Sequence, residues 1–256
     1  MKLIVNADDY GITMRVSEGI IHGMKQGLIT DTSALVNSVH FEKSSIMALE
    51  AGITSMGVHL NLTFMTPVLE ASAVQSIVDE SGRFYRKPGL IPSTYDPGEV
   101  RAELKAQIEK FLASGLTLNH LDTHHGVSVK DAQMLDLVME LAREYNVPMR
   151  RDDILSPELN GKLVDAGIRS TDILCGDPAM PTLQESWLRG VLDQYKDTDT
   201  ENIVEIAGHP GYADDELRSI SSLVEEREHD LAVLLNPALR EYVEEQGIQL
   251  ISYSQL

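Results

Sequence analysis

Short apolar runs alternate with amphipathic segments along most of the chain. Apolar runs of a few residues predict strands, and apolar residues repeated every three or four positions predict helices. In the segment Glu99–Ser114, the residues Val100, Leu104, Ile108 and Phe111 recur at helical spacing. We expect strands at Leu3–Ala7, Ser33–Asn37, Met56–Leu62, Leu118–Thr123, Val147–Arg150, Ile203–Ala207 and Gln249–Tyr253. We expect helices at Val16–Gly27, Phe41–Ala51, Glu99–Ser114, Ala132–Tyr145 and Pro237–Gln246.

This alternation predicts an α/β fold with a parallel sheet. About seven strands suit a (β/α) barrel, although an open doubly wound sheet would give a similar pattern. No Ser/Gly-rich linker divides the chain, so we expect a single catalytic domain over residues 1–256. The stretch Thr66–Pro97 contains four of the ten prolines and no clear periodicity. We therefore expect a rim insertion at about 64–97 that forms a substrate wall or lid. The charge run Glu225–Asp230 is expected to be the solvated face of a helix.

The composition disfavours several classes of partner. The formal net charge is −19, which disfavours nucleic acid and anionic membrane surfaces, because both are bound through Lys and Arg. No segment approaches the roughly 20 apolar residues of a membrane span, and the first apolar run is too short for a signal peptide. We expect a cytoplasmic protein. Cys175 is the single cysteine, which excludes an intrachain disulfide, and its apolar surroundings predict a buried, inert thiol.

Polar groups able to bind metal or transfer protons occur where apolar runs stop. They lie in the blocks Asn6–Gly11, Gly57–Thr63, His120–His125 and Gly208–Gly211. In an α/β barrel the C-terminal ends of the strands meet at one rim, so blocks far apart in sequence can line one site. Acid and imidazole groups at that rim suggest a hydrolytic metal centre.

The first two blocks each allow a structural interpretation. Asp8 and Asp9 are adjacent in an extended segment, so their side chains should point apart and have different roles. They could form a strand-end turn capped by an aspartate, with Gly11 left-handed. Alternatively, one carboxylate binds a metal and the other accepts a proton from water. His59, with Asn61 on the same strand face, is either a structural histidine or a ligand.

The third block is more specific. His120, Asp122 and His124 would share one face of a strand by the two-residue period. Imidazole with carboxylate suits Zn²⁺ and other divalent ions, and a metal-bound histidine commonly donates its second N–H to an acid. A polar strand end with internal hydrogen bonds is the alternative.

The remaining candidates are a histidine and an arginine at strand ends. His209 precedes Pro-Gly and is either a turn residue or a general acid, since imidazole titrates near neutrality. Arg150 either forms a structural salt bridge or holds an aspartate ionised. The sequence has no P-loop, dinucleotide fingerprint or Gly-x-Ser-x-Gly elbow, so covalent serine or cysteine catalysis lacks support.

Four ordered motifs resemble a known family. They are Asn-Ala-Asp-Asp-Tyr-Gly at 6–11, Gly-x-His-Leu-x-Leu-Thr at 57–63, His-Leu-Asp-x-His-His at 120–125 and His-Pro-Gly at 209–211. The chain is similar to the YdjC-like carbohydrate deacetylases, which include chitooligosaccharide (chitobiose) deacetylases. The region from Arg227 to Leu234 and the last helix and strand are also similar. The resemblance is weakest at 64–97 and 155–200.

The resemblance implies an irregular, polysaccharide-deacetylase-like (β/α) barrel that hydrolyses N-acetyl groups on amino sugars with a divalent metal, usually Mg²⁺. By position, Asp8 would be the base, and Asp9, His59 and His124 would be the metal ligands. Many members have further histidines where this chain has Gly126 and Ser128. Chitobiose therefore does not follow as the substrate.

We therefore expect a metal-dependent deacetylase of amino sugars or short oligosaccharides, acting in oligosaccharide degradation. Asp8 would take a proton from water, His209 would protonate the departing amine, and Arg150 would keep Asp8 ionised. His125 and Asn61 are expected to contact the substrate. Mg²⁺ is the expected metal, although Zn²⁺ and Mn²⁺ suit the same ligands, and a homodimer follows from base rates. The alternatives are a metal hydrolase or isomerase of a phosphorylated disaccharide, and a non-catalytic sugar-binding regulatory protein.

Overall fold

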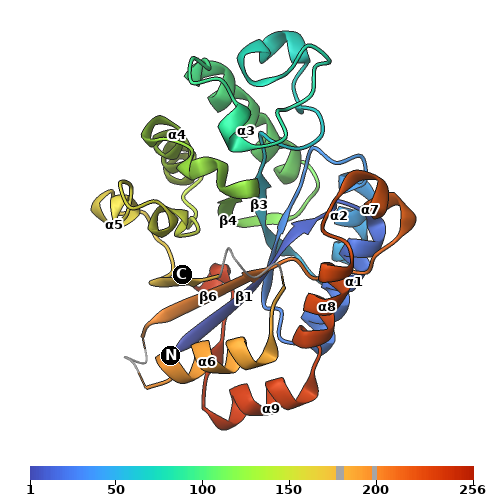
Figure 1. Cartoon of the computed structure of the whole chain (residues 1–256), viewed down its shortest axis with the longest axis vertical. Helices are drawn as coiled ribbons and strands as arrows, with labels where there is room; N and C mark the ends of the chain where they lie inside the picture. The colour runs from blue at the N-terminus through green and yellow to red at the C-terminus, as the bar shows by residue number, and fades with distance from the viewer. Residues whose placement is uncertain (177–181, 198–200) are drawn as a thin grey trace. The chain divides into compact units, whose positions relative to one another are not determined.

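The computed structural model describes residues 1–176, 182–197 and 201–256 (Figure 1). By its internal contacts the chain forms two compact units. Unit 1 comprises Met1–Ser33 with Thr171–Leu256, and unit 2 comprises Ala34–Ser170. The expectation of a single catalytic domain stays a prediction.

A seven-stranded sheet has the strand order β4 (Thr117–Thr123), β3 (Ser55–Leu60), β2 (Asp31–Ala34), β1 (Lys2–Tyr10), β6 (Ile203–Gly208) and β5 (Ile173–Cys175), and β7 (Gln249–Leu250) pairs with β1. The registers of β1 with β6 and β7, of β3 with β4 and of β5 with β6 are all parallel. The predicted α/β class with a parallel sheet is confirmed. No pairing within the described residues joins β4 to β5, so closure of the sheet into a barrel stays a prediction.

Unit 1 is built around the buried strand β1, Lys2–Tyr10, and the helix that follows it. Helix α1 starts after Thr13, whose side chain accepts a hydrogen bond from the Val16 amide, and ends at Gly27. A Cβ on Gly27 would lie 2.5 Å from the Leu234 carbonyl oxygen, so the close approach of the chain there requires glycine. The other strands are β2 (Asp31–Ala34, which reaches into unit 2), β5 (Ile173–Cys175), β6 (Ile203–Gly208) and β7 (Gln249–Leu250). The helices are α1 (Met14–Gln26), α6 (Glu185–Tyr195), α7 (Asp215–Ile220), α8 (Glu225–Leu234), α9 (Pro237–Glu245) and the 3-10 turn η6 (Tyr253–Gln255).

Helices α6 and α9 lie side by side in unit 1 (Figure 1). The Arg189 guanidinium lies over the Tyr242 ring at 4.5 Å, and the Asn236 side chain donates to Glu185 at 2.7 Å. Asn236 also caps α9, whose first residue is Pro237, as the sequence predicted.

Unit 2 contains the neighbouring strands β3, Ser55–Leu60, and β4, Thr117–Thr123. The insertion between β3 and helix α3 (Pro97–Leu112) forms three 3-10 turns rather than α-helices or strands. The start of the insertion is hydrogen-bonded to α3. The carboxylate of Glu103 on α3 accepts from the amides of Val68 and Leu69 at 2.8 and 3.0 Å. The elements of unit 2 are α2 (Phe41–Glu50), β3, η1 (Ala71–Ala73), η2 (Gln75–Ile77), η3 (Pro88–Leu90), α3 (Pro97–Leu112), β4, η4 (His124–Val129), α4 (Ala132–Glu144), η5 (Asp152–Leu155) and α5 (Lys162–Asp165).

Most expected elements are present, and three strand predictions are corrected. The strand placed at Ser33–Asn37 ends at Ala34, because the chain turns there and the Ser38 amide bonds to the Leu35 carbonyl. Within Val147–Arg150 only Met149 makes a β-bridge, to Leu121, before the chain turns into η5. The strand placed at Gln249–Tyr253 stops at Leu250.

Other elements were not predicted, and one surface assignment holds only in part. Strand β5 and helices α5, α6 and α7 lie in a region without an expected element. The charge run Glu225–Asp230 does begin α8, but it is not simply a solvated face, since Arg227 and Asp230 are both 2% exposed. Cys175 is buried, and burial raises the pKa of its thiol to about 11, as expected of an unreactive cysteine.

The helices of the described residues are all too short or too polar to span a membrane.

Candidate functional site

The end of β1 presents two buried carboxylates with different partners. Asp8 accepts a hydrogen bond from the Asn6 side chain at 2.8 Å, whereas Asp9 pairs with the Arg227 guanidinium at 2.5 Å. Both aspartates are at most 5% exposed. The two carboxylates therefore have different partners, while opposite side-chain directions and separate chemical roles stay predictions.

A tight turn directs the chain from these carboxylates into α1. Asp9 has a φ of 71° and Gly11 a φ of 87°, both in the left-handed region. The Gly11 amide donates to the Ser17 hydroxyl at 2.9 Å, and the Ile12 amide donates to the Asp9 carbonyl at 3.1 Å. The left-handed Gly11 that the structural interpretation included is therefore present. A non-glycine residue in this conformation costs about 1 kcal/mol or more, so the turn around Asp9 is held by its surroundings.

His209 follows β6 in unit 1, and its backbone is fixed by a buried acid. The Asp230 carboxylate accepts from the His209 amide at 3.1 Å and from the Leu183 amide at 2.7 Å. Burial raises the pKa of Asp230, while its amide donors oppose the rise. The His209 side chain is half-buried. Asp230 therefore fixes the position from which the imidazole projects.

Helix α8 thus contacts the two segments of unit 1 that carry candidate site residues, the one at the end of β1 and the one after β6. Arg227 binds Asp9 through its side chain, and its carbonyl accepts from the Gly211 amide at 3.0 Å. Gly211 needs to be glycine, because a Cβ there would lie 2.9 Å from the Val16 side chain. Sequence reasoning missed Arg227 and Asp230 as site residues, since a charge run alone does not reveal which members are buried.

In unit 2, His59 and Asp122 are register partners on β3 and β4. The His59 Nδ1 lies 2.8 Å from Asp122 Oδ1, and Arg150 Nη1 lies 3.0 Å from Asp122 Oδ2. Although burial opposes ionisation, the charges of His59 and Arg150 hold the pKa of Asp122 well below its usual range. An ionised carboxylate only accepts hydrogen bonds, so His59 donates from Nδ1, and in its neutral form the imidazole keeps the lone pair on Nε2, which can act as a ligand.

Arg150 therefore forms a salt bridge, which was one of the two interpretations of this residue from the sequence. The carboxylate that pairs with Arg150 in unit 2 is that of Asp122. The sequence placed Asp122 on the same strand face as His120 but assigned it no role. The proposed effect of Arg150 on Asp8 stays a prediction.

His120, on the same strand as Asp122, is fully buried. Its Nδ1 lies 2.7 Å from the Asn119 side-chain oxygen, and its Nε2 lies 3.9 Å from Asp122 Oδ2. A Cβ on Gly57 would lie 2.3 Å from the His120 ring, so glycine at this position of β3 gives the imidazole its space.

His124 begins the turn η4, which is anchored by a buried carboxylate. Asp152 Oδ2 accepts from Thr123 Oγ1 at 2.9 Å and from Ser128 Oγ at 3.0 Å. Burial raises the pKa of Asp152 to about 6, with Arg150 opposing and Asp122 reinforcing the rise. Ser128, where many relatives are expected to have histidine, therefore has a structural partner in this chain. Sequence reasoning missed Asp152, because it lies in a segment without a motif.

The two predicted substrate contacts differ in their surroundings. His125 is exposed, has a φ of 57°, and its Nδ1 lies 3.0 Å from Thr63 Oγ1. Asn61 is buried, and its amide group donates to the Phe64 carbonyl at 2.8 Å and to the Asn37 side chain at 3.1 Å. This geometry gives Asn61 a structural role, while direct substrate binding by either residue stays a prediction.

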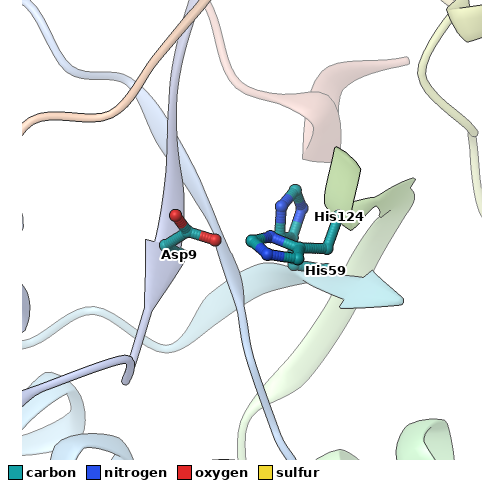
Figure 2. A group of neighbouring side chains, drawn as sticks. All are labelled: Asp9, His59 and His124. Atoms are coloured by element: carbon teal, nitrogen blue, oxygen red, sulfur yellow. The ribbon is translucent and has the colours of Figure 1, made fainter. Parts of the chain in front are cut away.

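Two groups of buried side chains could hold a metal ion, and within each group the ligand atoms lie within 4.8 Å of one another. The first is Asp9, His59 and His124, drawn in Figure 2, and the second is Asp8, His59 and Asp122. In the second group both Asp122 oxygens are already bound, Oδ1 by His59 Nδ1 and Oδ2 by Arg150 Nη1, whereas in the first group Arg227 binds Asp9 through Oδ2. The first group is therefore the better candidate. One carboxylate with two imidazoles suits several divalent ions and does not select among them.

Comparisons with known proteins cover the whole chain. A carbohydrate deacetylase from Listeria monocytogenes serotype 4a is 33% identical over 260 residues, and one from Brevibacillus brevis is 36% identical over 260 residues, each with 100% of both chains covered. A crystal structure from Enterococcus faecalis, whose name proposes the cleavage of cellobiose phosphate, is 33% identical with a TM-score of 0.91. It covers 99% of this chain and 98% of that one.

A more distant structure shares the fold alone. The lactam utilization protein from Thermus thermophilus matches with a TM-score of 0.59 at 15% identity over 98% of this chain and 99% of its own. The family of YdjC-like proteins matches residues 2–245. This match, together with the full-length relatives, shows that the chain belongs to the YdjC-like family.

Proposed function

We propose that the protein is a metal-dependent hydrolase that removes N-acetyl groups from amino sugars or short oligosaccharides. The full-length relatives named carbohydrate deacetylase support a deacetylase acting on a small carbohydrate. The observation that carries metal dependence is the buried donor set Asp9, His59 and His124.

The donor set fits a divalent ion, because neighbouring polar side chains hold each of its three ligands in place. Asp122 accepts a hydrogen bond from His59 Nδ1, which leaves Nε2 of the neutral imidazole as the ligand atom. Arg227 binds the Asp9 carboxylate. Asp152 accepts from Thr123 and Ser128 and thereby holds the turn η4 in which His124 lies. When bound, a divalent ion supplies Lewis acidity that polarises the acetyl carbonyl and lowers the pKa of water.

The remaining roles belong to residues of this chain. Asp8, oriented by the Asn6 amide, accepts the proton of the attacking water. Water oxygen adds to the acetyl carbon, the C–N bond breaks, and the amine leaves with a proton donated by His209. The products are acetate and a free amino sugar. Arg150 is proposed to favour the ionised form of Asp8, in addition to its pairing with Asp122.

Acetate release tests the proposal directly. The purified protein is stripped with a chelator, reloaded with Mg²⁺, Mn²⁺ or Zn²⁺, and incubated with N-acetylglucosamine and its di- and trisaccharides. We expect metal-dependent acetate release and, among these ions, the highest activity with Mg²⁺. Turnover that is unaffected by chelation would contradict metal dependence, and no acetate from any N-acetylated sugar would contradict the deacetylase.

The same incubation separates the two alternatives. The name of the Enterococcus faecalis structure motivates a parallel arm with cellobiose phosphate, in which glycosidic cleavage or isomerisation without acetate would favour phosphorylated-disaccharide chemistry. Thermal stabilisation by sugars without any turnover would favour a sugar-binding regulatory protein.

Two finer proposals concern biological context. We propose a role in oligosaccharide degradation, which predicts higher kcat/KM for short oligosaccharides than for polymeric substrate. We also propose a homodimer, which light scattering on the eluted protein would show as about twice the 28.3 kDa chain mass.

A further inference from the structure

The rim insertion starts with an aromatic side chain beside a candidate metal ligand. The ring centroids of Phe64 and His124 lie 5.6 Å apart with an interplanar angle of 45°. Phe64 is only half-buried, although the surrounding apolar residues Leu60 and Leu62 are fully buried. A large apolar ring left partly exposed next to a site of charged and polar groups is available to a ligand with an apolar face.

The backbone that carries this ring is held by two buried amides. Asn37 donates to the carbonyls of Phe64 and Thr66, each at 2.9 Å, and Asn61 donates to the Phe64 carbonyl at 2.8 Å. Asn61 also accepts from the Thr63 amide at 2.9 Å and donates to Asn37 at 3.1 Å. Most of the hydrogen-bonding capacity of both side chains is therefore used to fix a short segment around Phe64.

The conformation of this segment is locally unfavourable. Met65 has a φ of 65°, a left-handed conformation that costs a non-glycine residue about 1–2 kcal/mol. The chain is kept in it by the Asn37 and Asn61 bonds and by the Phe84 amide, which donates to the Met65 carbonyl at 3.1 Å. Strain retained beside a candidate site points to a requirement for one position of the ring.

We propose that Phe64 is a substrate-binding residue whose ring packs against the apolar C–H face of the sugar that carries the acetamido group. The proposal rests on the deacetylase function and adds to it the group that binds the sugar ring. Asn61 and Asn37 are then positioning residues that act through Phe64. This assignment gives Asn61, which the sequence predicted to contact substrate, an indirect part in the same binding step.

Replacing the ring tests the proposal. Phe64→Leu keeps an apolar side chain but removes the flat aromatic face, whereas Phe64→Tyr keeps the ring. We expect Phe64→Leu to raise KM for the N-acetylated sugar by roughly tenfold, the range seen for truncated anchor residues, with kcat changed less than KM. Phe64→Tyr should restore KM to within about twofold of wild type. Melting temperature and metal affinity, measured by calorimetric titration of Mg²⁺, should stay unchanged in both variants.

Binding of the deacetylated product distinguishes the contact from its alternatives. Glucosamine and its disaccharide lack the acetyl group, so they should lose affinity in Phe64→Leu if the ring contacts the sugar face. Unchanged product affinity with a raised KM would place the ring against the acetyl methyl and overturn the proposal. An unchanged KM, or a loss of metal in Phe64→Leu, would also overturn it, because the ring would then serve only to support His124.

If the proposed deacetylase function is wrong, the result differs from the outcomes that test Phe64. In that case the wild-type protein releases no acetate from any N-acetylated sugar. Calorimetric binding of N-acetylglucosamine and glucosamine to wild type and both variants would still decide the role of Phe64. Equal binding to all three proteins, or binding to none, would contradict it.

Discussion

Replacing Asp122 by asparagine should impair metal binding without removing any ligand. The carboxylate accepts from both His59 Nδ1 and Arg150 Nη1. Asparagine has a single oxygen, and the Arg150 cation competes for it more strongly than a neutral imidazole. The amide group would then face His59 Nδ1, which must become the acceptor, and the histidine proton would move to Nε2. The ligand atom would thereby be protonated.

The expected losses of metal affinity and of folding stability follow from the two contacts of the Asp122 carboxylate, with His59 and with Arg150. Loss of a hydrogen-bonding partner behind a metal-bound histidine weakens metal affinity by about 10- to 100-fold, which corresponds to about 1.4–2.7 kcal/mol. Folding stability should fall as well, since removing one member of a buried ion pair costs about 3–5 kcal/mol. We expect the lower end of that range, because Asp152 still interacts electrostatically with Arg150.

Two measurements separate metal affinity from stability. Calorimetric titration of metal into the stripped protein gives the affinity, and urea unfolding of the same metal-free protein gives the stability. The double variant Asp122→Asn/Arg150→Met should recover much of the stability, because no buried cation is left without its counter-charge. It should not recover tight metal binding. Asp136→Asn, which makes the same change on an exposed salt bridge with Lys162, is the matched control.

Wild-type metal affinity in Asp122→Asn would refute the reasoning. It would mean that His59 does not bind the ion through Nε2, or that its orientation is set by another contact.

Three further predictions concern other site groups. Asp8→Asn should keep its metal while acetate release collapses, whereas Asp9→Asn should weaken metal binding and regain part of its activity in excess metal. The opposite pattern of metal retention in the two variants would reverse the assigned roles. His209→Ala should lower kcat by roughly 10²–10⁴ with metal content unchanged, and loss of the metal would make His209 a ligand. Because burial raises the Asp152 pKa from 3.8 to about 6, its ionisation opposes folding as pH rises through that interval. Asp152→Asn should remove about 3 kcal/mol of this pH dependence, and identical pH–stability curves for wild type and variant would contradict the shifted pKa.

The sequence could predict the fold class and the placement of chemistry at strand ends, because both follow from local patterns. Parallel strands bring their C-terminal ends to one edge, so strand-end position alone makes Asp9 after β1, His59 in β3 and His124 after β4 reasonable candidates. Helix α6 was missed although Leu188, Val191 and Leu192 have helical spacing and are buried. That segment could have been found by the same periodicity test.

The supporting residues could not be predicted in the same way, because their roles depend on tertiary contacts. Arg227 lies 218 positions from Asp9, and within the run Glu225–Asp230 it looks like any surface charge. Asp122 was visible as a strand residue, but its pairing with His59 depends on a register that includes a shift between Met56 and Val58. A one-residue difference in register would have turned its side chain to the other face.

The pairing of buried charges also bears on the choice between substrates. Among the described residues, the buried Arg and Lys side chains are Arg150 and Arg227, which pair with Asp122 and Asp9 respectively. A phosphorylated sugar would have to draw these guanidinium groups away from buried carboxylates, which costs several kcal/mol for each uncompensated charge. Otherwise it would have to rely on the less buried cations of a chain whose net charge is −19. A neutral acetamido sugar requires neither. The charge pattern therefore favours hydrolysis of a neutral N-acetyl group over chemistry on a phosphorylated disaccharide.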